Sequence, residues 1–309
     1  MATKLIIDTD TASDDAVALV LALTDPRVEV LAITVVSGNV PVGMGTQNAL
    51  YTVELCGAQV PVHVGADRPL LREHVFAHEV HGRDGMGDVG LPLTGRVPAE
   101  GHAVDVIVDL VRRHPGEVTL VTLGPLTNLA LALRKAPDIA EKLARVVMMA
   151  GTGDHSGNVS PAAEFNVYVD PHAADAVMTS GAPLEMVGWD VSRKDAAVSL
   201  EENAELATLG PLGEFCSSIQ RQLVEFCREV TKIDGYDLPD PVTMAYAIDP
   251  GIATRTLDAY VRVETEGALT RGMTVVDHLG ILGQDPNCRV VLGADRERFM
   301  AMLREACSR

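Results

Sequence analysis

The 309-residue sequence is poor in aromatic residues and contains no long uncharged apolar run. Aromatic residues make up 4% of the chain, so a core built from its 47% hydrophobic residues consists mainly of Val, Leu and Ala, which suits buried parallel strands covered by helices. A membrane-spanning helix needs about 20 consecutive apolar residues, and the N-terminal segment lacks the basic stretch and apolar run of a signal peptide. We therefore expect a protein that has no membrane partner and works in the cytoplasm.

Basic residues are also scarce, since 25 Lys and Arg face 43 Asp and Glu and give a formal net charge of −18. Nucleic acids and anionic membrane surfaces would repel such a chain, so a small neutral or cation-bridged ligand is the better partner. The cysteines are odd in number and widely spaced, without a CxxC pair or a Cys/His cluster of zinc spacing. We expect them to be reduced and mostly buried: Cys56, Cys216, Cys227, Cys288 and Cys307.

The sequence does contain a cluster of four aspartates in one predicted strand-to-helix turn: Asp8, Asp10, Asp14 and Asp15. The apolar residues 5–7 predict the buried strand, and the apolar residues 16–23 predict the buried helix. Helix capping and the helix dipole, worth about 0.3–1 kcal/mol per acid, account for one or two of these carboxylates, not four. Because neighbouring carboxylates raise one another's pKa unless a cation lies between them, we expect a hard-cation site for Ca²⁺ or Mg²⁺.

Strand and helix signals alternate along the rest of the chain. Apolar runs predict strands at residues 28–36, 60–64, 117–123, 145–150, 184–188, 259–264, 272–276 and 288–292. Helical patterns predict helices at residues 42–56, 103–113, 170–180, 242–248 and 296–307, with further helical segments between 200 and 229. The alternation predicts an α/β fold with an open, mostly parallel, doubly wound (Rossmann-like) sheet flanked by helices. Without a linker, low-complexity tract or internal repeat, we expect one domain over residues 1–309.

Polar side chains follow several of these strands. Asn39 comes after the second strand, and a Gly-Pro turn at residues 124–128 follows the strand 117–123, so both lie on the rim that carries the acidic turn. In such a turn a main-chain carbonyl can serve a hard cation as a carboxylate does. The Gly-rich loop 151–166 adds Asn158, Glu164 and Asn166, amides and one acid of the kind that bind sugar hydroxyls.

The segment 73–87 breaks the alternation and contains three histidines and three glycines. We expect no helix there, because Gly82 and Gly85 lie so close to the histidines. The segment is interpreted as a mobile loop over the mouth of the site, with His81 as a ligand contact rather than a metal ligand. A surface loop without a functional role is the alternative interpretation.

Taken together, these residues resemble the inosine-uridine-preferring nucleoside hydrolases. The resemblance is collinear over nearly the whole chain and rests on five blocks. They are DTDTASDD at residues 8–15, His81-Gly82, TLGPLTNLALAL at 122–133, GNVSPAAEFNVYVDPHAA at 157–174 and DPVTMAYA at 240–247. The resemblance implies the nucleoside hydrolase fold and hydrolysis of the N-glycosidic bond of ribonucleosides. It also implies a homodimer or homotetramer and a role in nucleoside catabolism or salvage.

The resemblance also implies roles for individual residues. A Ca²⁺ ion would be held by Asp10, Asp15, Asp240 and the backbone carbonyl of Leu123. Asp10 would act as general base on a calcium-positioned water that attacks C1′ through an oxocarbenium-like transition state. The ribose hydroxyls would be bound by Asp14, Asn39, Asn158, Glu164 and Asn166. The base would lie between His81 and Phe165, with Asp8 supporting the site from behind.

Two positions depart from the family pattern. The family usually has Asp-Pro-Gly after the first aspartates, whereas this chain has Thr11-Ala12-Ser13. Many members carry a histidine directly before the aspartate at position 240, where it is a candidate acid for the leaving base, whereas this chain has Pro239. Because proline cannot donate a proton, help for the leaving group would come from Tyr236, from His81, from solvent or from no group at all.

Two other functions compete with this interpretation. Asp8-Thr9-Asp10-Thr11 also resembles the DxDxT start of magnesium-dependent phosphohydrolases, in which Asp8 would be the nucleophile, but that leaves the blocks at 157–174 and 240–247 unexplained. Alternatively, Pro239 marks a non-catalytic nucleoside- or ribose-binding protein. The intact Asp10 speaks against this second alternative.

Overall fold

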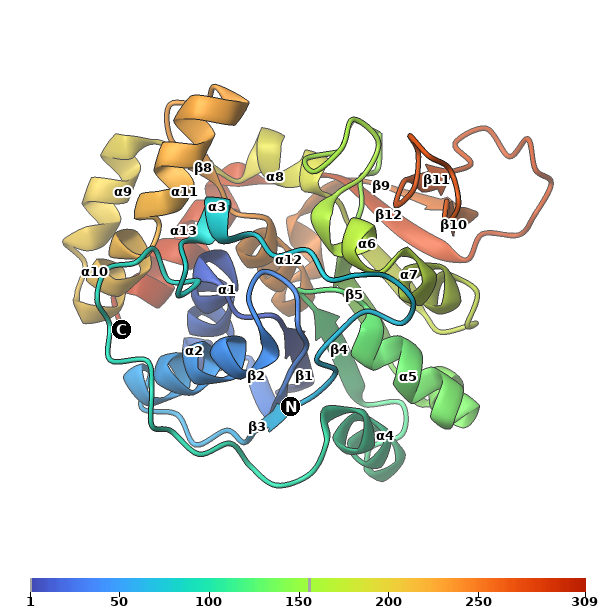
Figure 1. Cartoon of the computed structure of the whole chain (residues 1–309), viewed down its shortest axis with the longest axis horizontal. Coiled ribbons are helices and arrows are strands. Elements are labelled where there is room, and N and C mark those ends of the chain that lie inside the picture. The colour runs from blue at the N-terminus through green and yellow to red at the C-terminus, as the bar shows by residue number, and fades with distance from the viewer. Residues whose placement is uncertain (1, 155–156) are drawn as a thin grey trace.

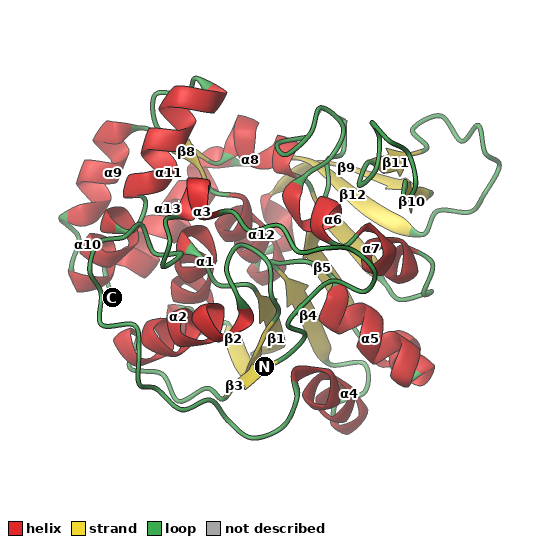
Figure 2. Ribbon diagram, viewed as in Figure 1, coloured by secondary structure: helices red, strands yellow, loops and turns green. Residues whose placement is uncertain are grey.

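The computed structural model describes residues 2–154 and 157–309, and a twisted central sheet organises it (Figure 1, Figure 2). In this described part, the sheet has eight strands in the order β3-β2-β1-β4-β5-β6-β12-β9. The strands are β1 (Thr3–Thr9), β2 (Val28–Val35), β3 (Val62–Val64), β4 (Val118–Thr122), β5 (Arg145–Met149), β6 (Leu184–Val187), β9 (Ala253–Ala259) and β12 (Cys288–Ala294). All neighbours are parallel except the edge pair β12 and β9. The predicted α/β fold with a mostly parallel sheet is confirmed.

Helices cover both faces of this sheet (Figure 2). The α-helices of the described chain are α1 (Ser13–Thr24), α2 (Val42–Leu55), α3 (His78–His81), α4 (Ala103–Arg113), α5 (Thr127–Lys135), α6 (Phe165–Val169), α7 (Pro171–Met178), α8 (Trp189–Asp195), α9 (Leu200–Ala207), α10 (Pro211–Ser218), α11 (Arg221–Phe226), α12 (Pro239–Ile248) and α13 (Arg296–Cys307). The described chain also has the 3-10 helices η1 (Pro137–Lys142) and η3 (Pro250–Ile252) and the π-helix η2 (Cys227–Thr231). In the part of the chain that the structure describes, no helix is long and apolar enough to cross a membrane.

The alternation of side chains along β1 divides the hydrophobic core into two layers. Leu5 and Ile7 belong to the cluster under α1, α2, α12 and α13, whereas Ile6 belongs to the cluster under α4, α5 and α7. All three side chains are completely buried. The strands are therefore apolar on both faces, as expected of a parallel sheet covered by helices on each side.

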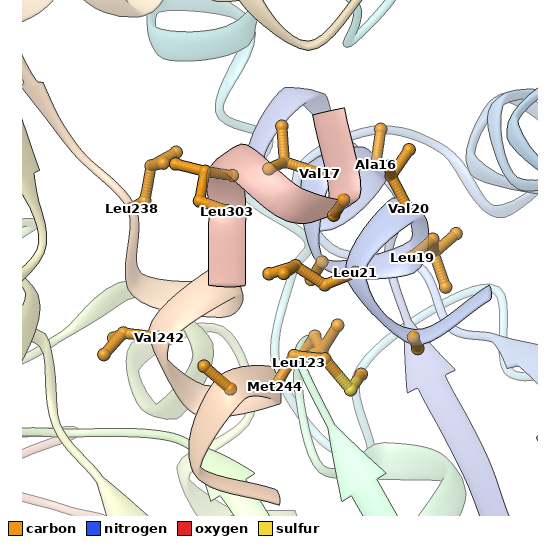
Figure 3. Close-up of a cluster of buried hydrophobic side chains, with 14 of the residues drawn as sticks. Ala16, Val17, Leu19, Val20, Leu21, Leu123, Leu238, Val242, Met244 and Leu303 are labelled. Atoms are coloured by element: carbon orange, nitrogen blue, oxygen red, sulfur yellow. The ribbon is translucent and has the colours of Figure 1, made fainter. Parts of the chain in front are cut away.

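Helix α1 is buried on all sides. Its residues from Ser13 to Ala22 are buried, and Figure 3 shows its apolar side chains packed against those of α12 and α13. Leu19 is completely buried in this cluster, and such a side chain contributes about 1.5–3 kcal/mol to stability. Because the helix is enclosed, the carboxylates in its first turn have fixed positions.

The strand order reverses direction beside β1, which has β2 on one side and β4 on the other. Asp8, near the end of β1, is level with Thr34 of β2 and Thr122 of β4. In open parallel sheets, ligands bind beyond the carboxyl ends of the strands at such a reversal. The chain therefore delivers its aspartate-rich segment to the place where this architecture binds ligands.

Several elements differ from the sequence-based prediction. The prediction of no helix at 73–87 is wrong, because α3 makes one turn and ends at Gly82, whose φ of +85° terminates the helix rather than preventing it. The predicted strand 259–264 is divided between the end of β9 and β10 (Val261–Val263), which pairs with β11 (Thr274–Val276). The prediction omitted β9, α6 and α8. It also omitted the small pair of β7 (Ala197–Val198) and β8 (Tyr236–Asp237).

Candidate active site

The turn between β1 and α1 holds the acidic cluster. Helix α1 begins at Ser13 with Ala12 as its N-cap, so Ser13 and Asp14 lie inside the first turn. The capping contact comes instead from Asp15, whose Oδ2 accepts the N–H of Ala12 at 2.9 Å. Its Oδ1 accepts the hydroxyl of Thr9 at 2.5 Å. These bonds fix the Asp15 carboxylate in a buried position.

Asp10 is completely buried at the end of β1. Its Oδ2 accepts the backbone N–H of Asn39 at 2.6 Å, whereas its Oδ1 has no hydrogen-bond partner among the described residues. Two glycines leave room for this side chain. A Cβ at Gly38 would lie 2.0 Å from Oδ2, and one at Gly124 would lie 2.7 Å from Oδ1. Any larger residue at these positions would displace the carboxylate.

Asp240, in the first turn of α12, completes the cluster from the far end of the chain. One oxygen each of Asp14, Asp15 and Asp240 lies within 4.8 Å of the other two. Asp10 remains outside this group of three, yet its charge helps to raise the pKa of Asp240. Two turns more than 200 residues apart in sequence thus form one acidic site.

The cluster is strained electrostatically unless protons or a cation balance it. Burial, and for Asp15 also the charge of Asp14, raises the pKa of Asp14 and Asp15 to about 6. Burial and then the charge of Asp15 raise the pKa of Asp10 and of Asp240. Buried oxygens without partners, Asp10 Oδ1 and Asp14 Oδ1, add to the all-oxygen donor set that a hard divalent cation prefers. The residues present therefore fit a metal ion.

The carbonyl of Leu123 follows β4 and is the predicted backbone ligand. It accepts the Nδ2 of Asn166 at 2.8 Å. A carbonyl oxygen has two lone pairs, so this bond leaves one for a further partner. The same Nδ2 also donates to the carbonyl of Met149 at 3.1 Å. Asn166 therefore ties together the ends of β4 and β5.

Glu164 is the N-cap of α6 and is held by backbone N–H groups. Its Oε1 accepts from Asn166 at 2.7 Å, and its Oε2 accepts from Gly151 at 2.8 Å. Burial raises the pKa of Glu164 to about 7, and the charge of Asp14 contributes to the increase. The carboxyl is therefore near the acidic cluster and positioned by the loop that carries it.

Asp8 lies behind the cluster and is completely buried. Its Oδ1 accepts the hydroxyl of Thr34 at 2.6 Å and the Nδ2 of Asn128 at 2.8 Å. Burial raises its pKa to about 7. These two hydrogen bonds tie the Asp8 side chain to β2 and α5, a position that supports the end of β1 from behind.

A cavity of about 600 Å³, including the open volume at its mouth, adjoins the cluster. Its wall consists of Asp14, Asn39, Ala77, Val80, His81, Asn158, Val159, Phe165, Trp189, Leu223, Phe226, Cys227, Thr231, Asp237 and Pro239. Five of the predicted substrate contacts are part of this wall. The predicted metal ligands and the pair Glu164 and Asn166 are buried deeper than the wall. The cavity thus joins an acidic end to a largely apolar end.

His81 contacts the N-terminus of α1 from α3. Its Nδ1 lies 2.9 Å from the Ser13 hydroxyl and 3.7 Å from Asp14 Oδ1. Burial lowers the pKa of His81 to about 4, although the charge of Asp15 opposes the shift. The imidazole is therefore neutral near pH 7 and serves as a hydrogen-bonding wall of the cavity rather than as an acid.

The structure argues against Tyr236 as a contact for the leaving base. Its side chain is buried, it is absent from the cavity wall, and its hydroxyl donates to Asn203 Oδ1 at 2.6 Å. The next residue, Asp237, lies on the wall instead. The sequence analysis missed Asp237, Trp189 and Phe226. The alternation of side chains in the two-residue strand β8 explains why the neighbour of Tyr236 faces the cavity.

Comparisons with known proteins point to one family. The family model described as inosine-uridine preferring nucleoside hydrolase matches residues 5–301. An uncharacterised protein of Schizosaccharomyces pombe is 40% identical over 99% of this chain and 99% of its own length. The pyrimidine-specific ribonucleoside hydrolase RihA of Salmonella typhimurium is also 40% identical, over 99% of this chain and 98% of its own.

Solved structures give the same result. A plant nucleoside hydrolase, the PpNRh1 enzyme, superposes with a TM-score of 0.91 at 35% identity and covers 100% of this chain and 99% of its own. An inosine-guanosine nucleoside hydrolase superposes with a TM-score of 0.92 at 36% identity, with coverage of 99% and 98%. The chain therefore belongs to the inosine-uridine preferring nucleoside hydrolase family, whose reaction is hydrolysis of the N-glycosidic bond of ribonucleosides to free nucleobase and ribose.

Proposed function

We propose that the chain hydrolyses ribonucleosides with Asp10 as the general base and with a Ca²⁺ ion in the acidic cluster. The ion would be held by Asp10, Asp15, Asp240 and the carbonyl of Leu123. The observation that carries the proposal is the buried cluster itself, in which Asp10 Oδ1 and Asp14 Oδ1 have no hydrogen-bond partners among the described residues. When bound, the cation offsets the carboxylate charges and orients water and the ribose hydroxyls.

The charge of the site suits the reaction. Breaking the N-glycosidic bond places positive charge on C1′ and the ring oxygen, and a carboxylate-rich cavity stabilises that charge more than the neutral ground state. Asp10 is held through one oxygen by Asn39, which leaves Oδ1 to accept a proton from the attacking water.

The remaining predicted residues would bind and frame the substrate. Asp14, Asn39 and Asn158 lie on the cavity wall and would bind ribose hydroxyls. Glu164 and Asn166 would complete that set from below the wall. His81 and Phe165 lie on the same wall and would flank the nucleobase. Asp8, bound to two neighbouring elements, would hold the end of β1 in place.

Release of free base tests this proposal. The panel contains purine and pyrimidine ribonucleosides, because the relatives' names include both classes. Wild type is expected to release base, and Asp10→Asn is expected to be at least about 100-fold slower because the general base is gone. Asp67→Asn, at an exposed aspartate, is the matched control and is expected to keep wild-type activity. Nucleoside binding without base release by wild type would contradict the proposal and favour a binding protein.

We also propose that the protein is a homodimer or homotetramer that works in the cytoplasm in nucleoside catabolism or salvage. The segment after β11 exposes Leu279 and Ile281 by 83% and 79%, and exposed apolar side chains of this kind favour association with a second copy. Light scattering after size-exclusion chromatography tests the oligomer. A monomer at micromolar concentration would contradict it.

A further inference from the structure

The departing nucleobase needs a proton, and Pro239 occupies the position where a histidine would supply one. Pro239 lies on the cavity wall, as do His81 and Phe165, which would flank the base. Among the described residues of the wall, a dissociable proton is carried by Asp14, His81, Cys227, Thr231 and Asp237. These five side chains are the candidate proton donors of the wall.

Four of these groups are poorly suited to donate. His81 is engaged with Ser13 and is neutral near pH 7 because burial lowers its pKa to about 4. Asp14 belongs to the acidic cluster. The hydroxyl of Thr231 donates to the carbonyl of Cys227 at 3.1 Å. Burial raises the pKa of the Cys227 thiol to about 11, so it is a weak acid.

Asp237 lies two residues before Pro239 and on the same cavity wall. It ends β8, where its backbone pairs with Ala197 of β7, and its side chain is 5% exposed on the cavity wall. The Ser192 hydroxyl donates to its Oδ2 at 2.8 Å and fixes the carboxyl. Its charge also raises the pKa of Asp14, which places it near the acidic cluster as well as in the cavity.

The surroundings of Asp237 accommodate both the protonated carboxyl that precedes proton transfer and the carboxylate that remains after it. Burial raises its pKa, which favours the protonated carboxyl before transfer. Ser192, Arg193 and the Trp189 indole, all from α8, stabilise the carboxylate that remains after transfer. The charge of Asp237 in turn raises the pKa of the Cys227 thiol in η2 and of the Asp14 carboxyl in α1.

We propose that the Asp237 carboxyl protonates the leaving nucleobase, the role for which Pro239 is unfit. This inference rests on the proposed hydrolysis of ribonucleosides. The C1′–N bond breaks with its electron pair on the base nitrogen, and the Asp237 proton goes to the base. The water oxygen bonds to C1′ and leaves a proton on Asp10. That proton passes to solvent, and solvent protonates Asp237 again, so one water is consumed for each base released.

Substrates with different leaving groups test the inference. Inosine and uridine need protonation of the base, whereas 4-nitrophenyl β-D-ribofuranoside releases a stable nitrophenolate without it. The kcat of Asp237→Asn on the nucleosides is expected to fall about 100- to 10,000-fold, the usual contribution of a general acid. Its kcat on the nitrophenyl riboside is expected to stay within about threefold of wild type, because binding and Asp10 are unchanged. Asp234→Asn, an exposed neighbour, is the control and keeps both rates.

The outcomes separate this inference from the proposed function. Wild type inactive on every substrate would overturn both. Wild type active with Asp237→Asn unimpaired, or equally slowed on nucleosides and on the nitrophenyl riboside, would overturn the Asp237 inference alone. If Asp237→Asn does not fold, Ser192→Ala gives the same comparison, since it removes the hydroxyl that fixes the carboxyl. A selective loss on nucleosides is again the expected result, and an equal loss or none overturns the inference.

Discussion

Addition of Ca²⁺ to the chelator-treated protein should raise its thermal stability, because the fold contains an acidic cluster that only protons or a cation can balance. Asp14 and Asp15 are buried, and burial raises their pKa values to about 6 from the usual 3.8. Each pKa unit corresponds to about 1.4 kcal/mol, so ionising either group in the fold costs on the order of 3 kcal/mol near pH 7. The two costs are coupled and do not simply add.

The sign of the pH dependence follows from the raised values. A carboxyl whose pKa is higher in the folded state binds more protons there, so its contribution to stability is present below pH 3.8 and is lost as the pH rises through about 6. The metal-free protein should therefore lose stability between pH 5 and pH 7. Ca²⁺ binds the ionised carboxylates and should remove most of this loss.

The magnitude can be estimated from linkage. A ligand at about 100 times its dissociation constant stabilises the folded state by about 2.7 kcal/mol. For a chain of this length, that corresponds to an increase of about 4 °C in Tm. Calorimetry at pH 7 with and without Ca²⁺ measures the shift, and Asp15→Ala is expected to abolish it. An unchanged Tm in wild type, or the same increase in Asp15→Ala, would refute the reasoning.

Further predictions concern the turn, the core and the loop that carries Glu164. Gly38→Ala should lower kcat at least about tenfold, because its Cβ would lie 2.0 Å from Asp10 Oδ2. Gly43→Ala is the control and should keep the wild-type kcat, because nothing lies within 4 Å of its added Cβ. Equal activities of the two variants would contradict this prediction. Leu19→Ala should cost about 2–5 kcal/mol in urea unfolding, and a loss below about 1 kcal/mol would show that α1 is not the enclosed helix described above. Glu164 has a pKa raised to about 7, so its contribution to stability falls as the pH rises toward 7. Glu164→Gln should therefore be more stable relative to wild type at pH 8 than at pH 5 in urea unfolding, and a difference that does not change with pH would refute that assignment.

The local pattern of the sequence is sufficient to predict the sheet. Buried strands such as β1 and β4 are short apolar runs bounded by turns, and their carboxyl ends meet at one rim, so the sequence pattern alone places Asp10 and Asn39 together. The sequence-based prediction omits the edge strand β9 because its exposed residues, 254–256 and Asp258, are polar and mask the apolar signal. One-turn helices such as α3 are too short to produce a helical period.

The site was predictable only in part for a related reason. Asp240 joins Asp14 and Asp15 through the packing of α12 against α1, a contact that no local pattern encodes, and it was anticipated only through the resemblance to a family. The sequence predicts Tyr236 as the base contact and gives no signal for Asp237, because the direction of a side chain in β8 depends on pairing with β7, about 40 residues earlier. The sequence alone therefore does not predict the contacts between segments that lie far apart in the chain.

The most direct test of the central claim is release of free base from ribonucleosides by enzyme stripped with a chelator, measured before and after Ca²⁺ is restored. The account predicts that the stripped enzyme is inactive and that Ca²⁺ restores release of base and ribose in equal amounts. Full activity of the stripped enzyme, or no activity after Ca²⁺ is restored while the Ca²⁺-dependent rise in Tm is present, would contradict it.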